Sequence, residues 1–125
     1  MSSLSAAPAG LAVPAEPRPQ RSSPPSHDLA CRMATALVAA TTGVDVDVML
    51  GRRRSAAPVA AARQLAMYLA HVALGLTQTE VAQAFQRDRT TVAHACRRVE
   101  DLRDERDFDR QVARMEECLR WVMEH

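Results

Sequence analysis

The feature that most constrains the fold is the helical spacing of apolar residues, which continues from Asp28 to the end of the chain. Short turn and capping signals divide this run into helix-sized pieces. The first piece begins at Asp28, which suits a helix cap, and ends at Gly43. Its predicted apolar stripe follows the spacing i, i+4, i+7, i+8 and consists of Leu29, Met33, Ala36, Leu37 and Ala40. The chain is therefore predicted to be all-α, a small helical bundle.

One short stretch departs from this spacing. Residues 44–48 alternate between valine and aspartate as a strand would, but an isolated strand has no partner in this chain. A short helix that is capped by Asp45 or Asp47 and ends at Leu50 is the better prediction. The next helix has Pro58 in its first turn, runs to about Leu74 and is apolar nearly all round, which predicts the buried centre of the bundle.

A helix, a tight turn and a second helix follow the central helix. Gly75 ends the central helix, and Thr77 with Glu80 forms a capping box for a helix over residues 78–85. After a break at residues 86–88, Asp88 is placed to cap a second helix whose stripe is Val92, Cys96, Val99 and Leu102. This order predicts a helix-turn-helix. A last helix is predicted to be capped by Asp107, with a stripe of Phe108, Val112, Met115, Leu119 and Val122.

Charge is unevenly distributed although the net charge is only +1. All 16 basic residues are arginines; residues 51–98 carry a net charge of +6, against −1 for residues 1–50 and −4 for residues 99–125. A basic middle is typical of proteins that bind polyanions. The absence of lysine excludes a Walker A phosphate loop and Schiff-base chemistry. With no nucleophile–base pair either, the chain is not expected to be an enzyme.

The remaining composition indicates a simple organisation. Residues 1–26 contain six of the seven prolines with much Ser and Ala and no periodicity, which predicts a disordered tail before a domain over residues 27–125. The three cysteines form no C-x-x-C pair, and His94 and Cys96 point in different directions on a helix, so neither a metal nor a cofactor is expected. Apolar runs are too short to span a membrane, and a cytoplasmic protein is expected.

The second helix of the predicted helix-turn-helix carries side chains suited to reading DNA. Arg89 in its first turn could bind the guanine major-groove edge, and Thr90 and Thr91 could reach base edges or thymine methyl groups. Arg97 and Arg98, two turns on, are placed for phosphates, and His94 lies on the same outward face. The alternative is that these side chains only solvate an ordinary helix pair.

The stretch from Arg87 to Glu100, Arg-Asp-Arg-Thr-Thr-Val-Ala-His-Ala-Cys-Arg-Arg-Val-Glu, closely resembles the signature of the C-terminal DNA-binding domain of the replication initiator DnaA. Residues 62–69 resemble the Arg-Gln-x-Ala-Met-Tyr-Leu helix of that family, and Leu50–Arg54 resembles its basic loop. The similarity covers about residues 28–122. It implies a stand-alone DnaA-like helix-turn-helix domain, without the ATPase module, that binds a DnaA-box-like site in double-stranded DNA.

The resemblance also implies roles for individual residues. Arg52, Arg53 and Arg54 correspond to an arginine loop that enters the minor groove, and Arg63 and Gln64 to a pair that contacts DNA from the central helix. Thr90, Thr91 and Ala95 correspond to base-facing positions. The full set of expected DNA-binding residues is Arg52, Arg53, Arg54, Arg63, Gln64, Arg87, Asp88, Arg89, Thr90, Thr91, His94, Ala95, Arg97 and Arg98.

Two departures from the family pattern concern this site. Arg89 stands where the family has histidine, and the turn around Gln86 is one residue shorter than the Phe-Gly-Gly-Arg of the family. The expected function is sequence-specific DNA binding in the regulation of replication initiation. The alternatives are a local transcription regulator, or a protein-interaction module that acts on the full-length initiator without binding DNA, which the acidic residues 99–125 would favour.

Overall fold

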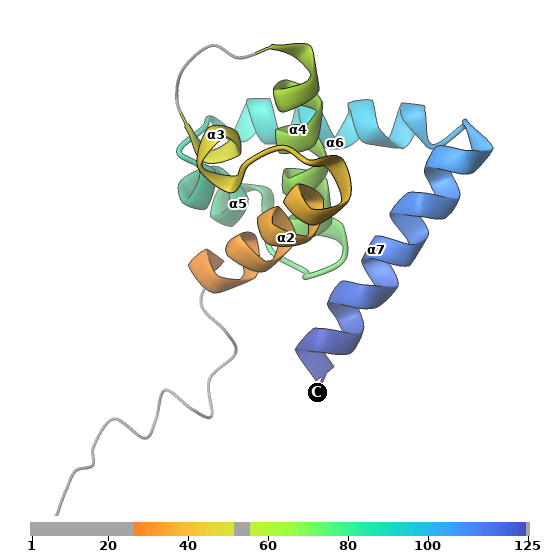
Figure 1. Ribbon diagram of the computed structural model, residues 1–125. Coiled ribbons are helices and arrows are strands. Elements are labelled where there is room, and N and C mark those ends of the chain that lie inside the picture. Colours follow the sequence, from red (N-terminus) through yellow and green to blue (C-terminus); the bar gives the residue numbers. More distant parts are fainter. Residues whose placement is uncertain (1–26, 52–55, 125) are drawn as a thin grey trace, which may run out of the picture.

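A computed structural model of the protein describes residues 27–51 and 56–124. The described residues form six helices and no strand, as the apolar spacing predicts. The helices are α2 (His27–Thr42), α3 (Val46–Leu50), α4 (Ala57–Val72), α5 (Gln78–Phe85), α6 (Arg89–Leu102) and α7 (Arg106–Glu124). In Figure 1, α5 lies on one side of the bundle and α7 runs along the opposite side. The tail predicted for residues 1–26 lies outside the described residues.

The helix α4 is the centre of the bundle, as its apolar character predicts. It packs against α2, α3, α5, α6 and α7. Seven of its residues are buried on all sides of the helix: Ala62, Leu65, Ala66, Met67, Tyr68, Leu69 and Ala70. The N-terminal turn of α4 contains Pro58. Backbone N–H groups in the first turn of a helix have no partner within the helix, so proline, which lacks this N–H, loses no hydrogen bond there. The helix ends at Val72, two residues earlier than predicted, and Gly75 follows with a left-handed φ of 77°.

The face that α2 buries is different from the predicted one. The buried residues are Ala30, Cys31, Ala34, Thr35 and Val38, whereas Leu29 is 46% exposed and Ala36 and Ala40 are exposed. The predicted stripe was therefore wrong for Leu29, Ala36 and Ala40, whereas Met33 and Leu37 are partly buried and pack against the core. Packing against α4 decides the face, and it selects small side chains that fit between the two helices. The buried Thr35 hydroxyl donates to the Cys31 carbonyl at 2.6 Å, so no polar group is left unsatisfied there.

The short helix α3 begins and ends as expected. Asp45 is its N-cap, and the Asp45 carboxylate accepts a hydrogen bond from the Asp47 N–H at 2.8 Å. Gly43, with a φ of 80°, separates α3 from α2. Met49 is completely buried and anchors α3 against the bundle.

The last helix begins one residue before the predicted cap. Glu105, rather than Asp107, accepts the hydrogen bond from the Phe108 N–H at 2.8 Å, and Asp107 lies exposed within the first turn. The side chains of Val112, Met115 and Leu119 are buried as predicted, and Phe108 is partly buried, but Val122 is 44% exposed. The predicted apolar stripe is therefore buried over most of α7 but is exposed near the C-terminal end of the helix.

A polar network joins α7 to α6 and α4. Arg103, at the end of α6, binds the Asp109 carboxylate and donates to Glu116 at 3.0 Å and to the Tyr68 hydroxyl at 2.9 Å. Burial acts to lower the pKa of Arg103, but the hydrogen bonds to Asp109, Tyr68 and Glu116 outweigh it and raise the pKa. Glu116 is only 7% exposed, and this arginine is the cation that balances it.

Candidate nucleic-acid interface

The predicted helix-turn-helix is present with the predicted helix limits. Thr77 and Glu80 form the capping box of α5: the Thr77 N–H donates to Glu80 Oε1 at 2.8 Å and the Glu80 N–H donates to Thr77 Oγ1 at 3.1 Å. The hydrogen bond from the Thr77 backbone lowers the pKa of Glu80 below its ordinary 4.5. These contacts hold the first helix of the pair at its N-terminus.

The turn between α5 and α6 is built on a left-handed glutamine. Gln86 has φ 55° and ψ 48°, and the N–H groups of Gln86 and Arg87 donate back to the Gln83 and Ala82 carbonyls. This is a Schellman-type ending, in which the left-handed position usually holds glycine. One residue in this conformation is enough to turn the chain toward Asp88, so the short turn still produces two successive helices.

One side of α6 is buried and the other carries the predicted DNA-binding residues. Val92, Ala95, Cys96 and Val99 are buried against the bundle. The exposed predicted residues of this helix are Arg89, Thr90, Thr91, His94, Arg97 and Arg98. Ala95 does not belong to this set: it is only 1% exposed, so the prediction that it faces bases is wrong. Ala95 lies at helical spacing from Val92 and Val99, so it is on the same inner side of α6 as they are.

Asp88 is the N-cap of α6 by its backbone conformation, as predicted, and it is exposed. Its side chain, however, makes no capping hydrogen bond. The first turn of α6 therefore begins with N–H groups that its own N-cap side chain does not bind, next to the exposed Arg89 and Thr90.

Two of the predicted arginines bind backbone carbonyls of the protein itself. Arg63 Nε donates to the Met49 carbonyl at 2.7 Å, and Arg87 Nη2 donates to the Gly51 carbonyl at 2.8 Å. Burial, and then the nearby Arg87 guanidinium, lower the pKa of Arg63. Both arginines thus gather at the end of α3, immediately before residues 52–54. The predicted Arg52, Arg53 and Arg54 lie outside the described residues.

The sequence does not predict that Arg63 and Arg87 bind these carbonyls. Arg87 and Gly51 are 36 residues apart in sequence, and no local pattern relates them. The resemblance assigned Arg63 and Arg87 only to the DNA interface. The structure shows that each binds the peptide that leads into the basic segment.

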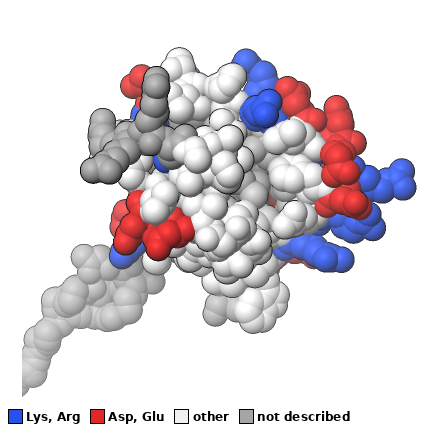
Figure 2. All heavy atoms as spheres, turned by 45° about the horizontal axis from the view of Figure 1, so that its top comes forward, with Lys and Arg blue, Asp and Glu red and all other residues white. Residues whose placement is uncertain are grey.

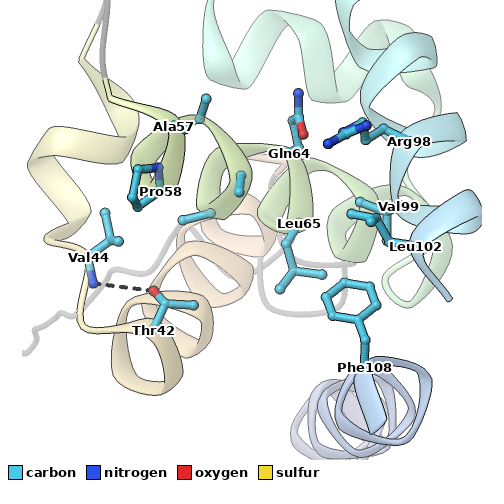
Figure 3. Close-up of a pocket in the computed structure, with 13 residues that line it drawn as sticks. Thr42, Val44, Ala57, Pro58, Gln64, Leu65, Arg98, Val99, Leu102 and Phe108 are labelled. Carbon is cyan, nitrogen blue, oxygen red and sulfur yellow. Dashed lines mark hydrogen bonds between the residues drawn. The ribbon is translucent and has the colours of Figure 1, made fainter. Parts of the chain in front are cut away.

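Gln64 is brought next to the second helix of the pair. Figure 3 shows Gln64 of α4 and Arg98 of α6 directed toward each other at one edge of a pocket of about 460 Å³. The pocket lies between the N-terminal half of α4, the C-terminal half of α6 and the start of α7, and its walls include Pro58, Leu65, Val99, Leu102 and Phe108. The predicted site residues therefore come from two helices that meet at this edge.

Charges are not spread evenly over the surface. In the view of Figure 2, acidic and basic side chains gather mainly along one side, and the middle of this face is largely uncharged. The exposed acidic residues of the corner between α6 and α7 are Glu100, Asp101, Asp104, Glu105 and Asp107. They directly follow the basic residues of α6, so the charge of the exposed side chains changes from positive to negative along that helix.

His94 and Cys96 lie on different sides of α6. His94 is exposed, whereas Cys96 is buried, and burial raises the pKa of the Cys96 thiol to about 11. A protonated thiol is a poor nucleophile. No group of three or more His, Cys, Asp or Glu residues is arranged to hold a metal ion within residues 27–51 and 56–124.

No helix in the part of the chain that the structure describes has the length and apolar character needed to cross a bilayer.

Comparison with known proteins identifies the same region. The family described as the bacterial DnaA protein helix-turn-helix matches residues 33–99. A crystal structure of a DNA replication initiation factor is 29% identical with a TM-score of 0.70, covering 85% of this chain and 32% of that one. The replication initiator DnaA bound to AMPPCP and single-stranded DNA gives the same identity and TM-score over 85% of this chain and 31% of that one.

A third solved structure, AMPPCP-bound DnaA from Aquifex aeolicus, is 29% identical with a TM-score of 0.66 and covers 82% of this chain and 30% of that one. The chain spans about a third of the length of these proteins. The family match covers more than half of the chain and includes α4, α5 and nearly all of the apolar stripe of α6. The chain therefore belongs to the family of the bacterial DnaA helix-turn-helix.

Proposed function

We propose that this domain binds double-stranded DNA by inserting the N-terminal half of α6 into the major groove. The observation that carries this proposal is the two-sided character of α6: Val92 and Cys96 face the core, whereas Arg89, Thr90 and His94 are exposed. Side chains at the start of such a helix contact bases, and arginines along its flanks contact phosphates. Arg97 and Arg98 take the phosphate role.

The basic segment 52–54 is proposed to enter the neighbouring minor groove. Arg63 and Arg87 support this, because they bind the carbonyls of Met49 and Gly51 and so place the start of that segment beside the turn that precedes α6. Arginine is favoured in a narrow minor groove by its negative potential. The site recognised is proposed to be DnaA-box-like, and the biological role to be regulation of the initiation of chromosomal replication.

Binding is expected to depend strongly on salt. Each neutralised phosphate contributes about −0.9 to the slope of log K against log salt, so about five contacts give a slope of roughly −4 to −5. Fluorescence anisotropy of a labelled duplex at several salt concentrations measures this slope. Arg97→Ala should reduce it by about one, and Arg120→Ala, an exposed arginine on α7, is the matched control that should leave it unchanged.

A second candidate function is favoured by the acidic corner between α6 and α7. Glu100 and Asp101 lie on α6 itself and would repel phosphates near its C-terminal half. A module that binds the full-length replication initiator, and not DNA, would use this corner. In vitro selection on a random duplex library separates the two functions: enrichment of one sequence supports DNA reading, and absence of binding at low salt with capture of the initiator supports the alternative.

A further inference from the structure

The outer side of α7 carries an ordered row of exposed charges that the proposed DNA interface does not use. Val112, Met115 and Leu119 face the core, and the residues opposite to them at helical spacing are all exposed. We define this outer stripe by its residues: Arg106, Arg110, Ala113, Arg114, Glu117, Trp121 and Glu124. In Figure 1, α7 runs along one side of the bundle and no other helix lies on its outer flank.

The two halves of the outer stripe have opposite charge. Its N-terminal half contains three arginines, and its C-terminal half contains Glu117 and Glu124 around Trp121. Within the described residues, Arg106, Arg114 and Glu117 make no side-chain hydrogen bond or ion pair, and Arg110 pairs only with the exposed Asp107 at 2.9 Å. An exposed pair of this kind is worth little, so Arg110 can change partners at small cost.

We infer that the outer stripe is the contact surface for a second copy of this chain, paired as two antiparallel α7 helices. In an antiparallel pair, two positions meet when their residue numbers add to a constant. A two-fold axis between residues 115 and 116 brings Arg114 to the partner's Glu117 and Arg110 to the partner's Trp121. Arg106 then lies within one residue of the partner's Glu124. Each contact occurs twice by symmetry.

The chemistry of these contacts is complementary in this orientation alone. Arg114 and Arg106 meet carboxylates, and the Arg110 guanidinium meets an indole face, a favourable cation–π pairing. Trp121 is 61% exposed, so its ring is accessible for this contact. Ala113, close to the two-fold axis, has no long side chain that would hold the helices apart. A parallel pair would instead bring arginine to arginine and glutamate to glutamate.

A second copy also fits better than an unrelated partner of one charge. An acidic surface would complement only the arginine half of the stripe, and a basic surface only the glutamate half. A second copy in antiparallel orientation presents the two halves in the required order. The α7 helix has 19 residues, which is about 28 Å, and the contact is small and polar. We therefore expect a weak, reversible dimer with a Kd on the order of 100 µM.

Charge exchange across the two-fold axis tests this dimer. Sedimentation equilibrium of the full chain from about 10 µM to 1 mM should show a monomer–dimer equilibrium. Arg114→Glu and Glu117→Arg should each weaken the dimer about tenfold, because each reversal acts at two symmetric contacts. The double variant Arg114→Glu/Glu117→Arg recreates both pairs with exchanged signs and should restore most of the affinity. Gln111→Glu, an exposed position of α7 outside the stripe, is the matched control.

Fluorescence provides an independent readout because Trp121 is the only tryptophan in the chain. Its emission should shift to shorter wavelength with rising concentration in the native protein and in the double variant, but not in the two single variants. Circular dichroism confirms that all variants keep native helicity. A protein that stays monomeric up to about 1 mM, or a dimer that the double variant fails to restore, would overturn the inference.

Discussion

At the scale of single residues, the arginines around the proposed interface have two different tasks. Arg89, Arg97 and Arg98 are exposed and available to a ligand. Arg63 and Arg87 bind the Met49 and Gly51 carbonyls. Arginine suits the second task because its planar, permanently charged group can bind a carbonyl with one N–H and keep others for another partner. Lysine, which this chain lacks, could not share its donors in the same fixed geometry.

Arg89 is the residue whose exchange should change specificity. Arginine favours the two acceptors of the guanine major-groove edge, whereas histidine, at this position in the family, is shorter and mostly neutral near pH 7. We expect the native protein to prefer guanine at one core position by roughly 5- to 150-fold, from the 1–3 kcal/mol of a bidentate contact. In vitro selection with the native protein and Arg89→His measures this. If both select the same sequence with equal stringency, Arg89 contacts only the backbone.

At the scale of helices, the turn of the helix-turn-helix has an unfavourable residue at its key position. Gln86 is the only residue other than glycine with a positive φ among those that the structure describes. A side chain in the left-handed region costs free energy that glycine avoids, which is why glycine usually follows a helix end of this type. We therefore expect this turn to be less stable with Gln86 than it would be with glycine at the same position.

Gln86→Gly should raise the free energy of unfolding by about 0.5–1 kcal/mol, because the left-handed strain removed exceeds the added entropy of the unfolded chain. Urea denaturation followed by circular dichroism measures the change. Gln83→Gly is the matched control, since Gln83 is exposed within α5 and glycine there should lower stability by about 1 kcal/mol. Equal effects of the two substitutions would show that the backbone conformation of Gln86 carries no cost.

At the scale of the whole molecule, the Arg103 network is the polar contact that holds α7 to the rest of the bundle. It joins the end of α6 to Tyr68 of α4 and to Asp109 and Glu116 of α7. The Arg103 guanidinium carbon also lies 5.9 Å from the centre of the Tyr68 ring. Apolar contacts of Val112, Met115 and Leu119 cover the remaining inner side of α7. The orientation of α7, and with it the outer stripe, depends on both sets of contacts.

Arg103→Ala should lower the free energy of unfolding by about 2–3 kcal/mol, because it leaves the nearly buried Glu116 carboxylate without a cation. Arg110→Ala is the control: it removes an exposed ion pair with Asp107 and should cost at most about 0.5 kcal/mol. Adding Glu116→Gln to Arg103→Ala should recover part of the loss, since a neutral amide is easier to bury. Thermal and urea denaturation measure these differences. A cost for Arg103→Ala no larger than that for Arg110→Ala would contradict the network.

The local features of this protein follow from the sequence by itself. The limits of α5, the capping box of Thr77 and Glu80 and the Asp45 cap agree with the structure because caps and periodic apolar spacing act over a few residues. The predicted stripe of α6 is buried at Val92, Cys96 and Val99, but Leu102 at its end is 40% exposed. The resemblance to the DnaA domain was also contained in short motifs. Only the tertiary structure decided which face of α2 is buried, since packing against α4 selects the side chains that fit between the two helices. Only the tertiary structure brought Arg87 to Gly51 and Arg103 to Glu116, because these contacts join segments that are distant in the sequence and no local pattern encodes them.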